Sequence, residues 1–288
     1  MIIGDNRKAV IENIKKFAES SEFHNKVELT DPMLTTAQAK AITDRYMESR
    51  YSLGFKIKTF FALRIAKIAT RIINKNTDIV GLENIPEGLE GVIITSNHFG
   101  PLENTVIRHL TNKLHRRKLN IISQTSNFAM KGFIGFLMNY ANTIPISVEP
   151  RYLARDFLSI MKEKLTEKKE AVLLYPEQEM WFNYRKPRPS KNGAYFYAAK
   201  LNVPIISCFV EMTDLDEDET EEFKKVKYTL HILGVLYPDK NKTPKENTEE
   251  LGQLDYEMKK ACYEKVYNKP LTYTFECSDI AGWKGSLD

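Results

Sequence analysis

Cysteine is scarce in this sequence: the 288 residues include only Cys208, Cys262 and Cys277. They lie far apart, are odd in number and form no C-x-x-C pair. The sequence therefore predicts neither a disulfide framework nor a zinc site. So few cysteines are typical of a protein from a reducing compartment.

Long apolar runs are also missing. No stretch reaches the roughly 18 strongly apolar residues that a membrane-spanning helix needs. The nearest candidate, residues 132–148, is uncharged but contains Asn139, Asn142 and Ser147, so we interpret it as a core element. Residues 1–5 have neither a basic start nor an apolar stretch, and we expect no secretory signal.

An excess of charge of one sign is absent as well. The 42 basic and 38 acidic residues leave a net charge of only +4. This excludes a strongly basic nucleic-acid-binding protein, but a local basic patch could still face an anionic ligand or a membrane. With 42% hydrophobic and 28% charged residues, the composition is that of a globular protein.

The pattern of apolar residues changes along the chain. Helical spacing predicts helices over residues 5–20, from Thr35 or Thr36 to about Arg50, and from Leu53 to about Asn74. After Lys75, short strand-like runs alternate with helical patterns. This alternation is typical of an α/β domain with a mostly parallel sheet flanked by helices. We therefore expect an N-terminal helical segment, residues 1–76, that could lie at a membrane interface, and an α/β domain, residues 77–288, with a C-terminal helix.

Seven strands are expected within the α/β domain. They are Asp78–Leu82, Gly91–Ser96, Leu119–Ser123, Thr143–Ser147, Ala171–Tyr175, Pro204–Phe209 and Val226–Leu236. Helical patterns lie near residues 101–114, 130–140, 151–168 and 191–201, and a closing helix is expected from Glu246 to Tyr267. The acidic stretch at 213–225 predicts a solvated loop.

The most informative segment is residues 96–104, Ser-Asn-His-Phe-Gly-Pro-Leu-Glu-Asn, which follows an apolar strand. Gly100-Pro101 predicts a turn, and proline suits the first turn of a helix. His98 is then expected at the carboxyl end of the strand, where ligands bind in open α/β sheets. The Glu103 carboxylate could orient the imidazole and stabilise the imidazolium, while the other ring nitrogen takes a proton from a substrate hydroxyl. On spacing alone, a surface histidine and an unrelated glutamate remain the alternative.

Asn97-His98 followed by Glu103 resembles the N-H-x4-D motif of the glycerolipid acyltransferase family, which includes the 1-acylglycerol-3-phosphate acyltransferases. Further segments resemble the family in its order. They are Gly81-Leu82-Glu83-Asn84-Ile85-Pro86, Gly132-Phe133-Ile134-Gly135-Phe136 ending in Thr143-Ile144-Pro145-Ile146, Tyr175-Pro176-Glu177, and Val203-Pro204-Ile205-Ile206. The resemblance covers roughly residues 78–236, and five segments in order make it specific.

The resemblance implies transfer of a fatty acyl group from acyl-CoA or acyl carrier protein to a hydroxyl of a glycerophospholipid precursor. The acceptor that it favours is the lysophospholipid 1-acylglycerol-3-phosphate, in phospholipid synthesis. It implies no cofactor beyond the thioester cosubstrate, no metal and no acyl-enzyme. His98 would be the general base and Glu103 its orienting partner, while Asn97 and Glu177 would contribute to substrate binding. The backbone amides near Gly100 are candidates for stabilising the oxyanion.

Three positions depart from the family pattern. Glu103 replaces an aspartate, Ser147-Val148 stands where an arginine often ends the second segment, and Gln178-Glu179-Met180 replaces Gly-Thr-Arg. The first departure changes the reach of the carboxylate, and the others remove the usual phosphate contacts. Two alternatives therefore stay open: a lipid-binding pseudoenzyme with this fold, and a membrane-surface scaffold.

A basic segment after Glu177 could replace the missing phosphate contacts. Four cations lie within the seven positions 185–191, and two prolines favour an extended loop. Arginine suits bidentate phosphate recognition, and a helix capped by Ser190 would add its N-terminus. The alternative is an exposed basic loop; binding of nucleic acid is not expected, because no recognised nucleic-acid fold accompanies the cluster. The residues that we expect to contact the phosphate are Arg185, Arg188 and Lys191.

The helical pattern at 53–74 combines an apolar arc with a basic arc about a quarter-turn away. Such a helix suits the headgroup region of a membrane that contains anionic lipid. The alternative is a helix packed on the core with solvated cations. Because a lipid acyltransferase needs access to its substrate, we expect a cytoplasmic protein held peripherally on the inner face of the membrane. The residues expected to contact the membrane are Lys56, Ile57, Phe61, Arg64, Lys67 and Arg71.

Overall fold

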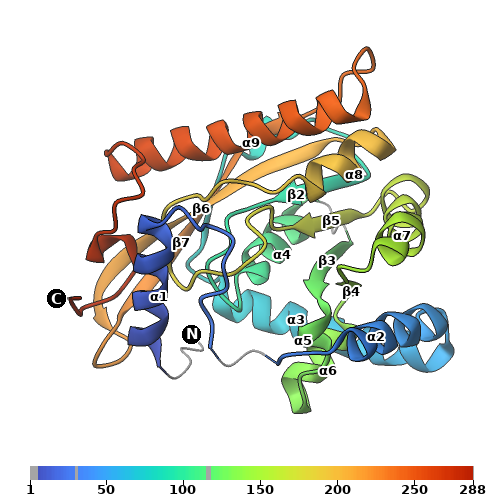
Figure 1. Cartoon of the computed structure of the whole chain (residues 1–288), viewed down its shortest axis with the longest axis horizontal. Helices are drawn as coiled ribbons and strands as arrows, with labels where there is room; N and C mark the ends of the chain where they lie inside the picture. Colours follow the sequence, from blue (N-terminus) through green and yellow to red (C-terminus); the bar gives the residue numbers. More distant parts are fainter. Residues whose placement is uncertain (1–5, 30–31, 115–117, 288) are drawn as a thin grey trace.

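The computed structural model describes residues 6–29, 32–114 and 118–287. Residues 1–5, where the sequence predicts no secretory signal and where the first helix is expected to begin, lie outside the described residues. One sheet lies at the centre of the molecule, with helices on both faces (Figure 1).

The sheet has seven strands in the order β1-β7-β6-β2-β5-β3-β4. Strands β6, β2, β5, β3 and β4 run parallel to one another, whereas β6 and β7 form an antiparallel hairpin. The mostly parallel α/β sheet predicted from the sequence is confirmed. The strands are β1 (Asp78–Val80), β2 (Val92–Thr95), β3 (Leu119–Gln124), β4 (Thr143–Ile146), β5 (Ala171–Leu174), β6 (Ile205–Asp218) and β7 (Lys224–Leu236).

The helices follow the predicted order, with the short α5 added. They are α1 (Arg7–Glu19), α2 (Thr36–Ser49), α3 (Leu53–Ile73), α4 (Asn104–Lys113), α5 (Thr125–Phe128), α6 (Gly132–Tyr140), α7 (Leu158–Lys162), α8 (Gly193–Leu201) and α9 (Pro244–Tyr267). Wider π-helical turns, Tyr152–Phe157 and Glu163–Glu167, flank α7, and short 3-10 turns occupy Leu82–Asn84 and Cys277–Asp279.

Capping side chains determine where three of these helices begin. Thr35 caps α2, and Ser52 accepts a hydrogen bond from the backbone N–H of Phe55 at the start of α3. Thr243 and Glu246 form a reciprocal capping box at α9, with Pro244 in the first turn. These local interactions explain why the starts of α2, α3 and α9 can be read closely from the sequence.

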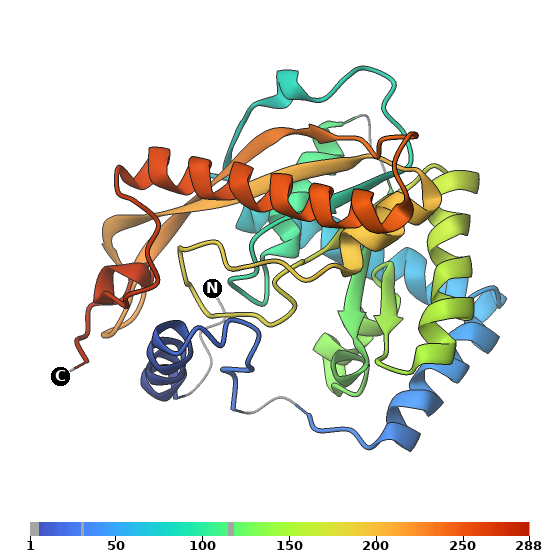
Figure 2. The same cartoon turned by 45° about the horizontal axis from the view of Figure 1, so that its top comes forward.

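Each buried strand contributes to two cores because successive side chains point to opposite faces. Ile93 of β2 packs on one face with residues of α8 and α9, such as Tyr195 and Leu251. Its neighbour Ile94 packs on the other face with residues of α4, such as Leu110. Helix α9 crosses the β6–β7 hairpin on its face of the sheet (Figure 2).

The acidic stretch at 213–225 differs from the predicted solvated loop. Strand β6 continues to Asp218 and β7 begins at Lys224, so most of the stretch belongs to the hairpin. Lys225 forms an ion pair of 2.5 Å with Glu217, and Lys224 approaches Asp216. Pairing with lysines of the neighbouring strand lets acidic residues occupy a strand, because opposite charges stabilise cross-strand neighbours.

The N-terminal helices occupy two separate places. Helix α1 lies beside the C-terminal tail, away from α2 and α3 (Figures 1 and 2). Its Ile11 and Ile14 share a core with Trp181 and Ile280. Helix α3 instead lies against α4, where Asn74, the residue after α3, donates a hydrogen bond of 2.9 Å to the Thr105 hydroxyl.

Candidate active site

Strand β2 carries the 96–104 segment to the carboxyl edge of the sheet. All four residues of β2 are buried, and Asn97 lies two residues after the end of this strand. The Asn97 side-chain amide donates to the carbonyl of Val210 at 3.1 Å and accepts from the Val210 N–H at 2.8 Å. It thus makes the pair of hydrogen bonds that a residue of a neighbouring strand would make with Val210. Asn97 is buried and fixes the backbone before His98; this differs from the substrate contact expected from the sequence.

His98 and Glu103 are brought together. The Nδ1 atom of His98 is hydrogen-bonded to one carboxylate oxygen of Glu103. The second oxygen accepts the backbone N–H of Phe99 and that of Gly100, the latter at 2.9 Å. The Glu103 side chain is 3% exposed and that of His98 is 20% exposed. The carboxylate therefore assigns the proton to Nδ1 and leaves Nε2 as the nitrogen that can accept a proton.

These hydrogen bonds also change the expectation for the oxyanion. The amides near Gly100 were candidates for stabilising it, but the N–H groups of Phe99 and Gly100 both donate to Glu103. In this structure the two amides hold the carboxylate, so they are not available to a substrate oxygen.

Tyr175 supports the imidazole from one side. Its ring stacks on His98 with centroids 4.3 Å apart and planes 8° from parallel. Burial, and then the Glu103 carboxylate, raise the pKa of Tyr175 well above its usual value, so the stacked ring stays neutral. No role for Tyr175 is evident from the sequence pattern, although it lies two residues before Glu177 in the resembling segment.

Glu177 and Arg188 form a buried ion pair beneath His98. The Arg188 Nε and Nη2 atoms donate to one carboxylate oxygen at 3.1 and 2.8 Å, and that oxygen also accepts the backbone N–H of His98 at 3.1 Å. Arg188 further donates to the carbonyl oxygens of Phe23 and Glu179. Its side chain is fully buried, so Arg188 is a structural ion-pair partner here and not the exposed phosphate ligand expected from the sequence.

Most other basic side chains of this segment also bind partners within the protein. Arg185 donates to the carbonyl oxygens of Met212 and Ser278 and to the carboxylate of Asp214. The Lys186 ammonium is buried against Asp279 at 2.6 Å. These contacts differ from the phosphate role expected for Arg185. Lys191 is exposed, and its phosphate role stays a prediction.

The expected cap of the following helix is also wrong. Helix α8 begins at Gly193 after Asn192, and no side chain caps it, so Ser190 does not have that role.

Residues 23–25 also support the site, a contribution that the sequence pattern does not indicate. The carbonyl of Phe23 accepts from Arg188 at 2.8 Å, and that of Asn25 accepts from the Trp181 indole at 3.0 Å. His24 lies 3.4 Å from the Glu177 carbonyl, and burial, assisted by Lys191 and Arg188, lowers its pKa. No local pattern could have indicated these contacts, since their partners lie more than 150 residues away along the chain.

Helix α3 exposes its apolar arc. Ile57, Phe61 and Ile72 are 50%, 57% and 71% exposed, whereas Ala62 and Thr70 are its buried residues. The alternative of an apolar arc packed on the core does not fit this exposure. The basic residues of this helix expected to contact the membrane, Lys56, Arg64, Lys67 and Arg71, are exposed as well.

Helix α6 continues the exposed apolar surface of α3. It contacts α3 and exposes Phe133 and Ile134, while only its Gly135 is buried. The core element predicted over residues 132–148 is thus correct for β4 and wrong for α6. Within the described parts of the chain, no helix is both long and apolar enough to cross a bilayer.

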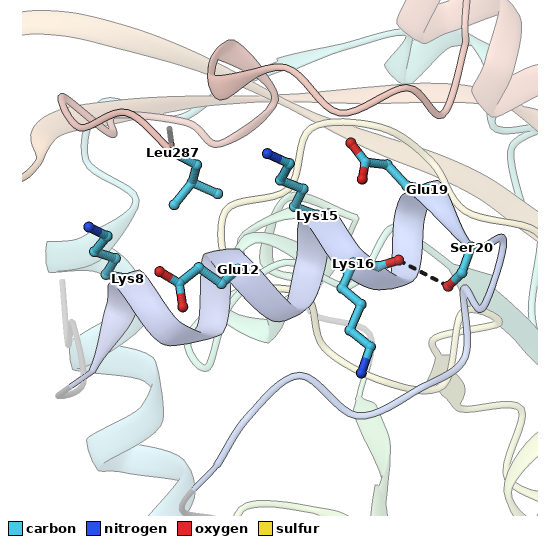
Figure 3. A pocket seen from close by; sticks show the side chains of 7 residues that line it. All are labelled: Lys8, Glu12, Lys15, Lys16, Glu19, Ser20 and Leu287. Carbon is cyan, nitrogen blue, oxygen red and sulfur yellow. Dashed lines mark hydrogen bonds between the residues drawn. The ribbon is translucent and has the colours of Figure 1, made fainter.

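Another cavity lies away from His98. It measures about 700 Å³ and runs along α1, where Leu287 approaches the helix from the C-terminal tail (Figure 3). Its polar lining includes Lys8, Glu12 and Lys15, and none of its lining residues belongs to the His98 site. Among residues 6–29, 32–114 and 118–287, no three His, Cys, Asp or Glu side chains are placed to hold a metal ion.

Comparisons with known proteins identify a similar family and a similar fold. Residues 76–211 match the family described as Acyltransferase. The fold resembles that of the 1-acyl-sn-glycerophosphate (LPA) acyltransferase PlsC from Thermotoga maritima, with a TM-score of 0.53 and 16% sequence identity. The similarity covers 92% of this chain and 98% of that one. No curated protein sequence matches the chain.

Proposed function

Because residues 76–211 match the acyltransferase family, we propose that this chain transfers a fatty acyl group to a hydroxyl of a glycerophospholipid precursor. The donor in this proposal is a thioester, acyl-CoA or acyl carrier protein, and the acceptor is 1-acylglycerol-3-phosphate. The observation that carries the proposal is the hydrogen bond between His98 Nδ1 and the buried Glu103 carboxylate.

The reaction follows from this contact. His98 Nε2 takes the proton of the acceptor hydroxyl while the hydroxyl oxygen attacks the thioester carbonyl carbon. Glu103 stabilises the imidazolium that forms. The C–S bond then breaks, the proton passes to the leaving sulfur, and an ester and a free thiol result. No covalent acyl-enzyme is needed.

The glutamate in place of aspartate fits this role. Glu103 precedes α4, and its longer side chain reaches back to His98 and to two backbone N–H groups at once. This complete set of partners argues against the pseudoenzyme alternative, which the altered first and third segments motivated.

The acceptor and the site of action are part of the proposal. The name of the Thermotoga maritima relative supports a 1-acylglycerol-3-phosphate acceptor. Among the basic residues expected to contact the phosphate, exposed Lys191 is the one that we retain. We place the enzyme on the inner face of the membrane, attached peripherally through the exposed apolar and basic residues of α3.

A transferase assay tests the proposal. The full chain is mixed with 1-acylglycerol-3-phosphate and long-chain acyl-CoA, and release of free thiol is followed. His98→Ala should lower the rate by about 10²–10⁴-fold, because general-base catalysis contributes that much. His109→Ala, which removes a histidine from the body of α4, is the matched control. A His98→Ala rate within a few-fold of wild type would remove His98 from the mechanism.

A further inference from the structure

A second cavity, of about 200 Å³, lies at the opposite edge of the sheet from His98. It is lined by Asn120 at the beginning of β3 and Thr143 at the beginning of β4. Strands β2, β5, β3 and β4 are parallel, so their beginnings share one edge, whereas His98 follows the end of β2. The cavity, which we call the amino-edge pocket, is therefore separate from the proposed active site.

Positive charge dominates the amino-edge pocket. The cations that line it are Arg50, Lys56, Lys118, Lys164 and Lys168. Glu163 pairs with Arg50 and Lys168, and Glu170 pairs with Lys118 and Lys164. Five cations share two carboxylates, so the charge around the pocket sums to +3. Burial, together with the nearby Lys118 and Lys168, lowers the pKa of Lys164 even though Glu170 lies 3.3 Å from its ammonium.

Two buried polar groups of the pocket are also unsatisfied. The Arg50 side chain is 9% exposed, and its Nη2 donates to Glu163 and to the Tyr51 hydroxyl. Its Nε is buried and has no hydrogen-bond acceptor among the described residues, and the same holds for the Thr59 hydroxyl. The Tyr46 hydroxyl lies near the guanidinium, but not in hydrogen-bonding geometry to Nε. Unpaired buried donors are uncommon in folded proteins, because they lose their hydrogen bonds to water.

We propose that the amino-edge pocket binds a phosphate group. A phosphate supplies negative charge that offsets the excess of three positive charges, and its oxygens can accept from Arg50 Nε and from the Thr59 hydroxyl. Arginine and lysine are the side chains that bind phosphate in proteins, the first by directed N–H donors and the second as a point charge. A volume of about 200 Å³ admits a phosphate with a small polar substituent.

The phosphate can belong to a lipid headgroup or to a soluble molecule. Lys56 lines the pocket and also begins the basic arc of α3, so the pocket adjoins the helix that we propose to contact the membrane. A headgroup bound there would hold the start of α3 to the sheet. The proposal does not depend on the acyltransferase reaction, because it uses none of the residues around His98.

Inorganic phosphate is the first probe. Binding to the full chain is measured by calorimetry in chloride buffers of equal ionic strength. Lys164→Gln and Lys118→Gln should each weaken binding at least 10-fold. The Lys118 side chain is 47% exposed, so its replacement keeps the fold, as an unchanged melting temperature in chloride would verify. Lys162→Gln, an exposed lysine of α7 outside the pocket, is the matched control and should bind as wild type does.

Vesicles of phosphatidylcholine with and without phosphatidic acid form the second arm. If the ligand is a lipid headgroup, Lys164→Gln and Lys118→Gln lose co-sedimentation with the phosphatidic acid vesicles, and inorganic phosphate competes with it. If the ligand is soluble, the two variants lose phosphate binding and sediment as Lys162→Gln does. Variants that match Lys162→Gln in both arms would overturn the proposal, as would a wild type that binds neither probe.

Discussion

Glu103 satisfies three donors with one carboxylate, and this makes Glu103→Gln a sharp test at the scale of a residue. Glutamine has the same size, but its amide offers one acceptor oxygen and turns an NH₂ group toward a donor. It also loses the negative charge that stabilises the imidazolium. We expect transfer to fall by about 10²–10⁴-fold, with a loss of about 1–3 kcal/mol of stability because a buried donor is left without an acceptor. The measurement is turnover of thioester at saturating donor.

Glu103→Asp separates charge from reach. Aspartate keeps the carboxylate but withdraws it by about one bond, and a misplacement of about 1 Å can cost on the order of 10²-fold. The variant should therefore be less active than wild type and more active than Glu103→Gln. An unimpaired Gln variant would instead mean that Glu103 has no part in proton transfer. A gain of activity with Asp would support the pseudoenzyme interpretation.

The buried pair of Glu177 and Arg188 gives a second prediction at this scale. Arg188→Met leaves the Glu177 carboxylate buried without its partner, and breaking such a pair typically costs about 3–5 kcal/mol of folding stability. The double variant Glu177→Gln with Arg188→Met should recover part of that loss, because no charge is left unpaired. Urea unfolding of wild type, single and double variants measures this coupling. Strictly additive losses would show that the pair is not coupled.

At the scale of an element, α3 combines exposed apolar residues with exposed cations, and both should contribute to membrane binding. Replacing Lys56, Arg64, Lys67 and Arg71 with Gln should weaken co-sedimentation with anionic vesicles, since each contact near the surface contributes about 1 kcal/mol. Raised salt should weaken the wild type in the same way. The apolar counterpart, Ile57→Ser with Phe61→Ser, should weaken binding at any salt concentration. Binding that is unchanged by both sets of substitutions would leave α3 without a membrane role.

The elements predicted well from the sequence are those whose determinants are local. The strand before His98 and the turn at Gly100-Pro101 depend on neighbouring residues, and they were predicted within a few positions. The strands β6 and β7 were predicted too short, because the acidic residues of β6 pair with lysines of β7 and this pairing is not visible in the sequence. Arg188 was placed at the surface because charge normally stays there, while its partner Glu177 lies 11 positions away. Ion pairs between side chains of different strands or loops therefore cannot be read from the sequence pattern.

At the scale of the whole molecule, the two ends of the chain converge on the active-site loop. Trp181 and Asn183 donate their N–H groups to the carbonyl oxygens of His98 and Phe99. The segment that contains Trp181 and Asn183 shares a core with α1 and with Ile280 near the C-terminus. Support for His98 therefore depends on α1, a helix that the sequence pattern places in the N-terminal segment outside the α/β domain.

Ile14→Ala tests this dependence. Ile14 is fully buried in the core that α1 shares with Trp181, so the cavity should cost about 2–5 kcal/mol of unfolding free energy. At about 2–4 °C per kcal/mol, the melting temperature should fall by roughly 4–20 °C. The turnover rate, measured well below that temperature, should also fall, because a loosened α1 moves the carbonyl oxygens of Phe23 and Asn25 that hold Arg188 and Trp181. Ile68→Ala, on the exposed arc of α3, is the control and should change stability by no more than about 0.5 kcal/mol. A destabilised Ile14→Ala with wild-type turnover would mean that α1 supports the fold alone, and that the ends of the chain do not hold the site in place.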